Sequence, residues 1–304
     1  MSNRPTIASL LPSTTEMACS LGLMDRIVAI SHECDYPSAV KGLEAITSSI
    51  IPHGLSQLEI DDFVVKAMRA GKSLYGVDAE RLSALSPDLV LTQGLCDVCA
   101  VTPDVIQTSL RGVQCDLPAS CRIVSMNGTS FAEICQDLLD LGTLTSTQTV
   151  AEQRVAEAKK QWTTIEQPTK EKPNLLLLEW IEPFFSAGHW VPEQIVAAGG
   201  VSAIGTPSDK SRKLTIAEVV ASSPTHIGVV CCGFNLEKNI SFASQLYQMP
   251  ELAAIPAIQT QQVWAFDANS YFSRPTLRIA RGAWLIGEMF AGRHSNGESQ
   301  RIVS

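Results

Sequence analysis

The chain has 304 residues, of which 45% are hydrophobic, and its 31 aspartate and glutamate residues outnumber its 23 lysine and arginine residues, giving a net charge of −8. The negative balance and the lack of any basic run argue against nucleic-acid binding, and no stretch approaches the roughly 18 apolar residues of a membrane span. The start of the chain lacks a signal-peptide core, and nine cysteines are too few for a disulfide scaffold. These features predict a cytoplasmic protein without a transmembrane segment.

Apolar runs alternate with helix-start signals through the first 144 residues. The first run ends at Leu11, and Ser13-Thr14-Thr15-Glu16 follows it as a capping box, in which a hydroxyl and a carboxylate satisfy free backbone N–H groups. Ser56–Glu59 fits the same pattern. This alternation predicts a mainly parallel sheet covered by helices on both faces. The predicted strands are 7–11, 27–30, 88–92 and 122–125, and the main predicted helices are 56–70, 78–85 and 131–141, with one more beginning near 102.

The longest predicted helix covers Thr145–Glu166. Thr149–Glu152 fits a capping box, and Pro168 ends the helix because proline lacks an N–H and clashes with the preceding turn. About 20 helical residues span about 30 Å, enough to join two compact lobes. We therefore expect an N-terminal α/β lobe at 1–144, a bridging helix at 145–168 and a C-terminal α/β lobe at 169–304; an amphipathic helix within one domain is the alternative. One apolar stripe is expected from Ala151, Val155, Ala158, Trp162 and Ile165.

Strand–helix alternation resumes after the long helix. Pro192 suits the first turn of a helix that Gly199-Gly200 end, and Thr215–Glu218 forms another capping box. The polar residues after 290 are expected to fray. The predicted strands of this half are 175–179, 226–232 and 263–266, and its last helix is 276–290.

Side chains able to bind or react are concentrated in the loops after the predicted strands. Ligands of open α/β sheets bind outside the carboxyl ends of the strands, so these loops predict the binding edge. Their aromatic rings suit a large flat ligand, although core packing is the alternative for Trp180, Trp190, Tyr271 and Phe272. The loops are 12–14, 32–36, 93–99, 180–190, 232–235 and 269–274.

Two of these loops carry a candidate metal site. Cys96 and Cys99 have the spacing of thiolate ligands, and His32 with Cys34 would complete a tetrahedral site for zinc, another soft metal or an iron–sulfur cluster. A redox dithiol and ordinary buried thiols are the alternatives. His32 or His189 could instead reach a cobalt or iron ion from one face of a tetrapyrrole.

Four passages resemble the substrate-binding proteins of the vitamin B12, haem and siderophore ABC importers. They are Ser9–Glu16, Leu21–Val28, Pro183–Gly200 and Asn269–Arg281, and the resemblance extends from about Ile7 to Phe290. It implies two Rossmann-like lobes with mainly parallel sheets, joined by one long rigid helix, and a ligand cleft between the lobes. Within that family, Phe185–Glu193 is most similar to cobalamin-binding members.

The resemblance implies a binding protein for a corrinoid (cobalamin-like) ligand or a related metal-tetrapyrrole, rather than an enzyme. The alternatives are a cytosolic zinc- or iron-binding protein that uses the thiolate and imidazole site and, third, a redox or cofactor-processing enzyme. No catalytic triad, phosphate-binding glycine loop or paired-carboxylate motif specifies a reaction. The expected ligand contacts are Ser13, Thr14, His32, Glu33, Cys34, Asp35, Tyr36, Trp180, His189, Trp190, Phe234, Tyr271, Phe272 and Arg274.

Two features depart from the importer proteins. The chain shows neither an export signal nor a lipid-anchor cysteine near its start, and the importer proteins seldom carry the loops 32–37 and 96–99 in this form. We therefore expect a cytosolic branch in which docking to a permease is doubtful, with Glu59 and Glu193 as conceivable docking residues. The sequence indicates a small-molecule ligand and gives no oligomeric state.

Overall fold

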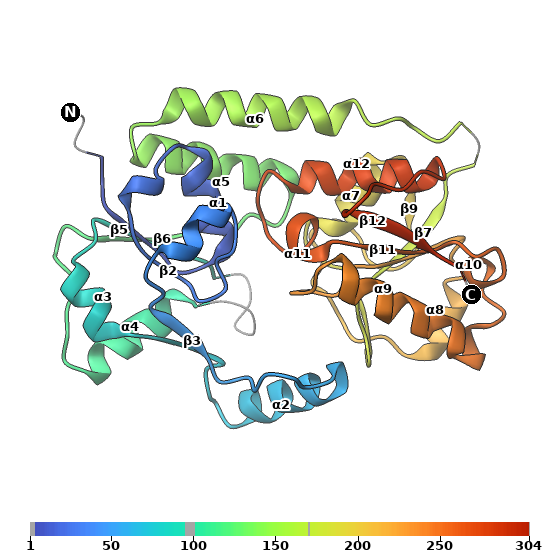
Figure 1. Cartoon of the computed structure of the whole chain (residues 1–304), viewed down its shortest axis with the longest axis horizontal. Helices are drawn as coiled ribbons and strands as arrows, with labels where there is room; N and C mark the ends of the chain where they lie inside the picture. The colour runs from blue at the N-terminus through green and yellow to red at the C-terminus, as the bar shows by residue number, and fades with distance from the viewer. Residues whose placement is uncertain (1–3, 95–100, 170, 304) are drawn as a thin grey trace. The chain divides into compact units, whose positions relative to one another are not determined.

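The computed structural model describes residues 4–94, 101–169 and 171–303 (Figure 1). The chain forms two compact units. Unit 1 comprises Met1–Gly128 and Ala132–Val155, and unit 2 comprises Thr129–Phe131 and Ala156–Ser304. Both units combine strands with helices, which confirms the predicted α/β class.

Unit 1 is built on a four-stranded parallel sheet in the order β2-β1-β5-β6. The strands are β1 (Ile7–Ser9), β2 (Ile27–Ile30), β5 (Leu89–Thr92) and β6 (Arg122–Ser125), which confirms all four predicted strands to within two residues. Apolar side chains from β1 and β5 pack against α3 and α4, so the short strands are buried. The helices are α1 (Pro12–Ser20), α3 (Ala79–Leu85), α4 (Pro103–Gly112) and α5 (Phe131–Leu144), of which only Phe131 belongs to unit 2.

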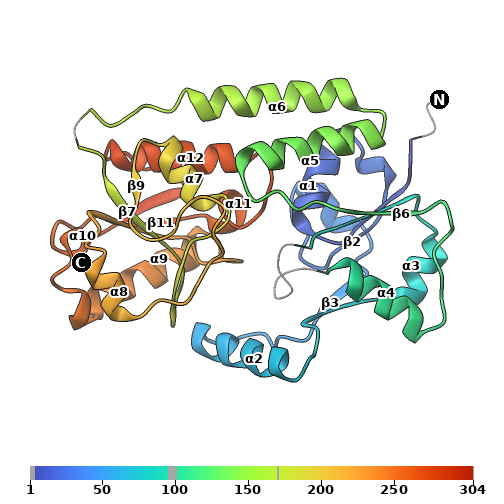
Figure 2. The same ribbon diagram turned by 180° about the vertical axis from the view of Figure 1, so that it is seen from behind.

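Two short strands of unit 1 were not predicted. β3 (Thr47–Ser49) and β4 (Tyr75–Val77) form an antiparallel pair, and α2 (Gln57–Arg69) lies between them in the chain. Both views show α2 apart from the four-stranded sheet (Figures 1 and 2). These strands have only three residues each: β3 is Thr-Ser-Ser and β4 has a glycine at its centre, so neither shows an apolar run.

Unit 2 contains a six-stranded mixed sheet with the order β12-β11-β10-β7-β8, with β9 also paired to β7. β7 (Asn174–Ile181), β10 (His226–Val229) and β11 (Val263–Phe266) are parallel, as predicted. β9 (Val201–Ser202) was not predicted, and β8 (Phe184–Ser186) lies where a loop was expected and runs antiparallel to β7. The helices are α7 (Val191–Ala197), α8 (Ile216–Ala221), α9 (Leu236–Gln245), α10 (Pro256–Gln259), α11 (Ala268–Tyr271) and α12 (Ile279–Phe290).

The expectation of a frayed C-terminal tail is wrong. Ser299–Ile302 form β12, which pairs antiparallel with β11, and Ile302 faces Val263 across the pair. Ile302 is buried, and Tyr247 donates a hydrogen bond to its carbonyl oxygen at 2.9 Å. The two buried ends of this short strand, Ser299 and Ile302, therefore fasten the tail to the sheet.

The long helix α6 covers Gln148–Thr163, shorter at both ends than predicted. The boundary between the two units falls inside it, between Val155 and Ala156. Its N-terminal part runs beside α5 in both views, and Gly142 of α5 permits this because an added Cβ would lie 2.6 Å from Ala151 (Figure 2). In the described residues, no helix is both long and apolar enough to cross a membrane.

Two of the four predicted capping boxes are confirmed, and two are wrong. Ser56–Glu59 and Thr215–Glu218 form the complete reciprocal arrangement at α2 and α8. The other two predictions are wrong: α1 begins at Pro12 with Leu11 as a cap that lacks a side-chain bond, and Thr149 lies inside α6. Pro12 sets the backbone angle of the first turn by itself, which releases the hydroxyls that follow it for other bonds.

Candidate functional site

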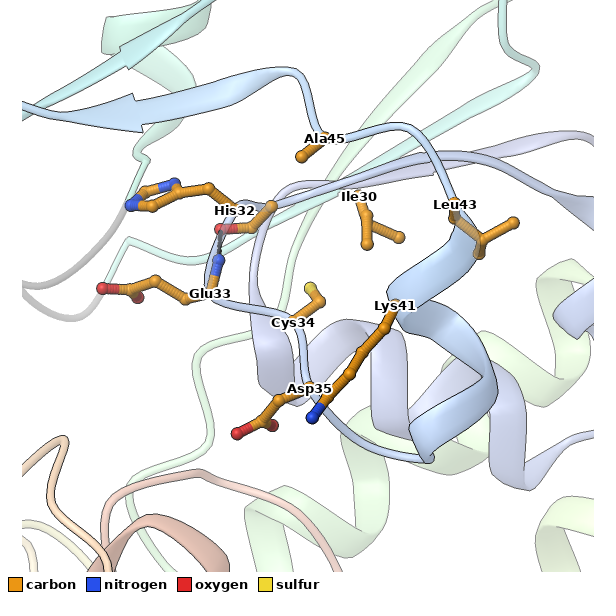
Figure 3. Close-up of a pocket in the computed structure, with 9 residues that line it drawn as sticks. Ile30, His32, Glu33, Cys34, Asp35, Lys41, Leu43 and Ala45 are labelled. Carbon is orange, nitrogen blue, oxygen red and sulfur yellow. Dashed lines mark hydrogen bonds between the residues drawn. The ribbon is translucent and has the colours of Figure 1, made fainter.

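A cavity of about 320 Å³ opens in unit 1 at the carboxyl end of β2 (Figure 3). It lies beside the loop that was predicted from its density of reactive side chains. Most of its lining comes from residues 30–35. The remainder comes from Lys41 of the short 3-10 helix Ser38–Gly42 and from Leu43 and Ala45, which follow that helix. The lining residues are Ile30, Ser31, His32, Glu33, Cys34, Asp35, Lys41, Leu43 and Ala45.

A directed chain of hydrogen bonds fixes the Cys34 end of this loop. Thr14 donates to the Leu11 carbonyl at 3.0 Å and Thr15 donates to Ser9 Oγ at 2.8 Å, so neither hydroxyl has a second proton to give. The 2.7 Å bond between Ser9 and Thr14 therefore runs from Ser9, and the 3.1 Å contact between Cys34 and Thr15 runs from the Cys34 thiol. The reduced, protonated thiol of Cys34 thus anchors the loop to α1.

Thr47 fixes the other end of the loop through His32. Its Oγ1 accepts a bond from the His32 backbone N–H at 3.0 Å and lies 2.6 Å from the Nδ1 of the imidazole. Thr47 belongs to the buried start of β3, whereas His32 itself is exposed. The loop is therefore held at both ends, and the imidazole sits on a rigid base.

The side chains of the loop point in different directions (Figure 3). The imidazole of His32 and the carboxylate of Glu33 extend to one side, while the Cys34 sulfur lies on the side of Ile30 and Leu43. The structure therefore does not bring together the imidazole and thiol expected in the four-ligand metal site. Cys96 and Cys99 lie outside the described residues, and within those residues no cluster of three or more histidine, cysteine or acidic side chains could hold a metal ion.

The remaining predicted contacts of unit 1 differ in exposure. Ser13 and Thr14 are buried in the first turn of α1, Asp35 is half-buried, and Tyr36 is 48% exposed. Figure 3 shows the carboxylate of Asp35 beside the amine of Lys41 at the rim of the cavity. Charged groups of both signs therefore flank its opening.

In unit 2, Trp180 and Phe234 were predicted as ligand contacts on separate loops, and the structure brings them together. Their ring centroids are 5.8 Å apart, and Phe234 also meets Phe242 edge-on at 5.0 Å. Trp180 and Phe234 are half-buried and pack against the core formed by β7, β10 and β11. Each therefore keeps part of its ring exposed at the carboxyl end of the sheet.

The segment 186–190 holds a neighbouring loop in place. Gly188 lies so close to the backbone of 209–211 that an added Cβ would be 2.2 Å from the Ser211 nitrogen. The His189 backbone is left-handed, with φ 56°. Its N–H donates to the Asp209 carbonyl, and its carbonyl accepts from the Ser208 N–H.

The His189 side chain is half-buried, and burial, followed by the charge of Lys210, lowers its pKa below the ordinary value. A lowered pKa keeps this imidazole neutral at pH 7.

Trp190 and Phe272 form part of the interior of unit 2. Trp190 is 6% exposed, and its indole N–H donates to the Phe272 carbonyl at 2.8 Å. Phe272 is 2% exposed and packs against Phe266 with a centroid distance of 5.2 Å. This burial favours the core-packing alternative for these two rings.

Tyr271 and Arg274 follow at the end of α11. The Tyr271 hydroxyl donates to Glu298 at 2.7 Å, and Arg281 donates to the same carboxylate from Nε at 3.2 Å and from Nη2 at 2.6 Å. Burial raises the pKa of Tyr271, and the bond to Glu298 adds to the rise. Arg274 is buried. At this end of the predicted site, the Tyr271 hydroxyl is therefore used in a structural hydrogen bond, while part of its ring stays exposed.

The comparisons with known proteins agree with this architecture. The model of the periplasmic binding protein family matches residues 7–269. A vitamin B12-binding protein of Yersinia pestis is 24% identical over 290 residues, covering 94% of this chain and 86% of the relative. Among solved structures, the periplasmic vitamin B12 binding protein of Vibrio cholerae has a TM-score of 0.64 at 20% identity and covers 94% of this chain and 96% of its own. The periplasmic haem-binding protein of the same organism has a TM-score of 0.67 at 19% identity, covering 93% and 98%.

The chain belongs to the periplasmic binding protein family. Members of this family are solute-binding proteins and not enzymes. The fold and function class expected from the sequence are therefore confirmed.

Proposed function

We propose that this protein binds a corrinoid of the vitamin B12 type, or a closely related metal tetrapyrrole, without turning it over. The observation that carries the proposal is the match to a vitamin B12-binding protein across 94% of the chain. The chemistry at the strand ends supports it, because partly exposed rings such as Trp180, near the end of β7, and Phe234 suit a large flat ligand.

The proposed contacts fall into two groups. In unit 1 they are the exposed or half-buried residues of the loop after β2, namely His32, Glu33, Asp35 and Tyr36. In unit 2 they are Trp180, His189, Phe234 and Tyr271, all half-buried. We give less weight to Trp190, Phe272, Ser13, Thr14 and Arg274, which are buried.

Haem is the second candidate ligand, because a haem-binding protein is among the structural neighbours. A corrin and a porphyrin have different absorption bands and different metals. We therefore expect protein purified anaerobically from its own host to show a corrin band with near-equimolar cobalt. A porphyrin band with iron would move the assignment to haem, and zinc or iron without a macrocycle band would favour a metal site that includes Cys96 and Cys99.

The cytoplasmic location is also part of the proposal. Nine cysteines, an odd number, suit a reducing compartment, and none of the seven described ones is in a disulfide. Fractionation of the host cells with a specific antibody should find the protein in the cytoplasmic fraction. Release by osmotic shock would overturn this part of the proposal.

A further inference from the structure

The hydrogen bonds of Thr47 determine which nitrogen of His32 carries the proton. A hydroxyl has one proton and two lone pairs. Thr47 Oγ1 donates its proton to Ser31 Oγ at 3.1 Å and accepts the His32 backbone N–H at 3.0 Å. One lone pair remains for the imidazole, whose Nδ1 lies 2.6 Å away. The Nδ1 of His32 must therefore be the donor, and in the neutral ring Nε2 carries the free lone pair.

The segment that carries Thr47 is held in place by backbone hydrogen bonds. The segment that leads to Thr47 is bonded to β2, because the Ile30 N–H donates to Glu44 at 2.8 Å and the Ile46 N–H donates to Ile30 at 3.0 Å. Thr47 then pairs with Val77 across the β3–β4 ladder and is only 9% exposed. The exposed imidazole of His32 is thus hydrogen-bonded to a buried threonine whose position is fixed by the β3–β4 pair.

Metal-binding histidines in proteins are generally supported in this way, with one ring nitrogen fixed by a hydrogen bond and the other directed to the metal. His32 lines the cavity, and the carboxylate of Glu33 extends to the same side of the loop (Figure 3). A carboxylate beside the imidazole suits a ligand whose metal centre carries positive charge.

We propose that Nε2 of His32 coordinates the metal ion of the bound corrinoid, so that the protein selects corrinoids with an exchangeable axial ligand. The inference rests on the proposed function and names the group that would determine its specificity. In the exchange, a cobalt–nitrogen bond forms to Nε2, a cobalt–oxygen bond to water breaks, and the water leaves. No electron is transferred and the corrin ring is unchanged.

The test compares aquacobalamin, whose axial water exchanges, with cyanocobalamin, whose cyanide does not leave readily. Aquacobalamin should bind the native protein with a shift of its main absorption band and about tenfold tighter than cyanocobalamin. His32→Ala should still bind both corrinoids but lose the shift and the preference. Thr47→Val removes the bond to Nδ1 and should weaken aquacobalamin binding about tenfold, the usual effect of losing such a support.

His53→Ala is the matched control, because His53 is another exposed histidine of unit 1 and should leave both the shift and the preference unchanged. Circular dichroism of each variant checks that it is folded. Binding of aquacobalamin to the native protein without a band shift would overturn the inference alone, and so would a shift that His32→Ala retains. Failure of both corrinoids to bind the native protein would overturn the proposed function and this inference with it.

Discussion

The carboxylate of Glu193 accepts a hydrogen bond from the backbone N–H of Phe131 at 2.7 Å, although the two residues are 62 positions apart. Phe131 is the first residue of α5 and belongs to unit 2, as does Glu193 of α7, so this carboxylate satisfies a backbone N–H that the start of a helix leaves free. The Phe131 ring is also stacked on Trp162 with a centroid distance of 4.1 Å. From the sequence, Glu193 is a conceivable permease-docking residue; the structure gives its carboxylate a role within the fold.

Replacing Glu193 by alanine should lower the free energy of unfolding by about 1 kcal/mol, the usual cost of losing a helix cap. Glu193→Gln keeps an oxygen acceptor and should lose less. Urea unfolding followed by circular dichroism measures both values. Equal stability of Glu193→Ala and the native protein would contradict the capping role.

Trp190→Phe should reduce stability while leaving ligand affinity nearly unchanged. The substitution leaves the Phe272 carbonyl without its indole donor in a buried position, which costs about 1–3 kcal/mol. Unfolding in urea and a ligand titration on the same sample separate the two effects. A loss of affinity with unaltered stability would instead place Trp190 in the ligand contact.

Gly188→Ala should be strongly destabilising, because its new Cβ would lie 2.2 Å from the backbone nitrogen of Ser211. Overpacking of this kind costs about 1–3 kcal/mol or more. Gly112→Ala is the matched control: nothing lies within 4 Å of its Cβ position, and it lies at the end of α4. Thermal unfolding should show a lower midpoint for Gly188→Ala only, and similar midpoints for the two variants would refute the close contact.

His226 should make the stability of unit 2 sensitive to pH. It packs edge-on to Phe290 at 5.5 Å, and burial, followed by the charge of Arg301, lowers its pKa from 6.5 to about 4. Because the unfolded chain binds this proton more readily, the contribution of the neutral ring is complete above about pH 6.5 and is lost as the pH falls towards 4.

His226→Gln should therefore show a smaller loss of stability than the native protein between pH 7 and pH 4.5. The comparison of His226→Gln with the native protein cancels the pH-dependent contributions of other groups. One such group is Asp137, whose pKa is raised to about 6 by burial. Urea unfolding across this range gives the two curves. Parallel curves for the two proteins would exclude a role for His226.

Much of the fold was predictable because apolar runs and cap signals are local. Val263–Phe266 and Arg122–Ser125 were predicted at their observed bounds. The short strands β3, β4, β8, β9 and β12 were missed, because each consists partly or wholly of polar residues or glycine and shows no long apolar run.

The candidate site was predictable only as a set of loops. The loop after β2 was found from its composition, but its anchors Thr15 and Thr47 are ordinary hydroxyl residues, 19 and 15 positions from Cys34 and His32. No local pattern reveals such pairs. The same limit applies to Trp190 and Phe272, whose burial depends on packing between distant segments.

The central claim is that this chain binds a corrinoid. Equilibrium dialysis of the purified protein against equal amounts of aquacobalamin and haemin tests it most directly, because the two ligands compete under one condition. The account predicts near-equimolar bound cobalt and little bound iron. Bound haem without corrinoid, or neither ligand retained at micromolar concentration, would contradict it.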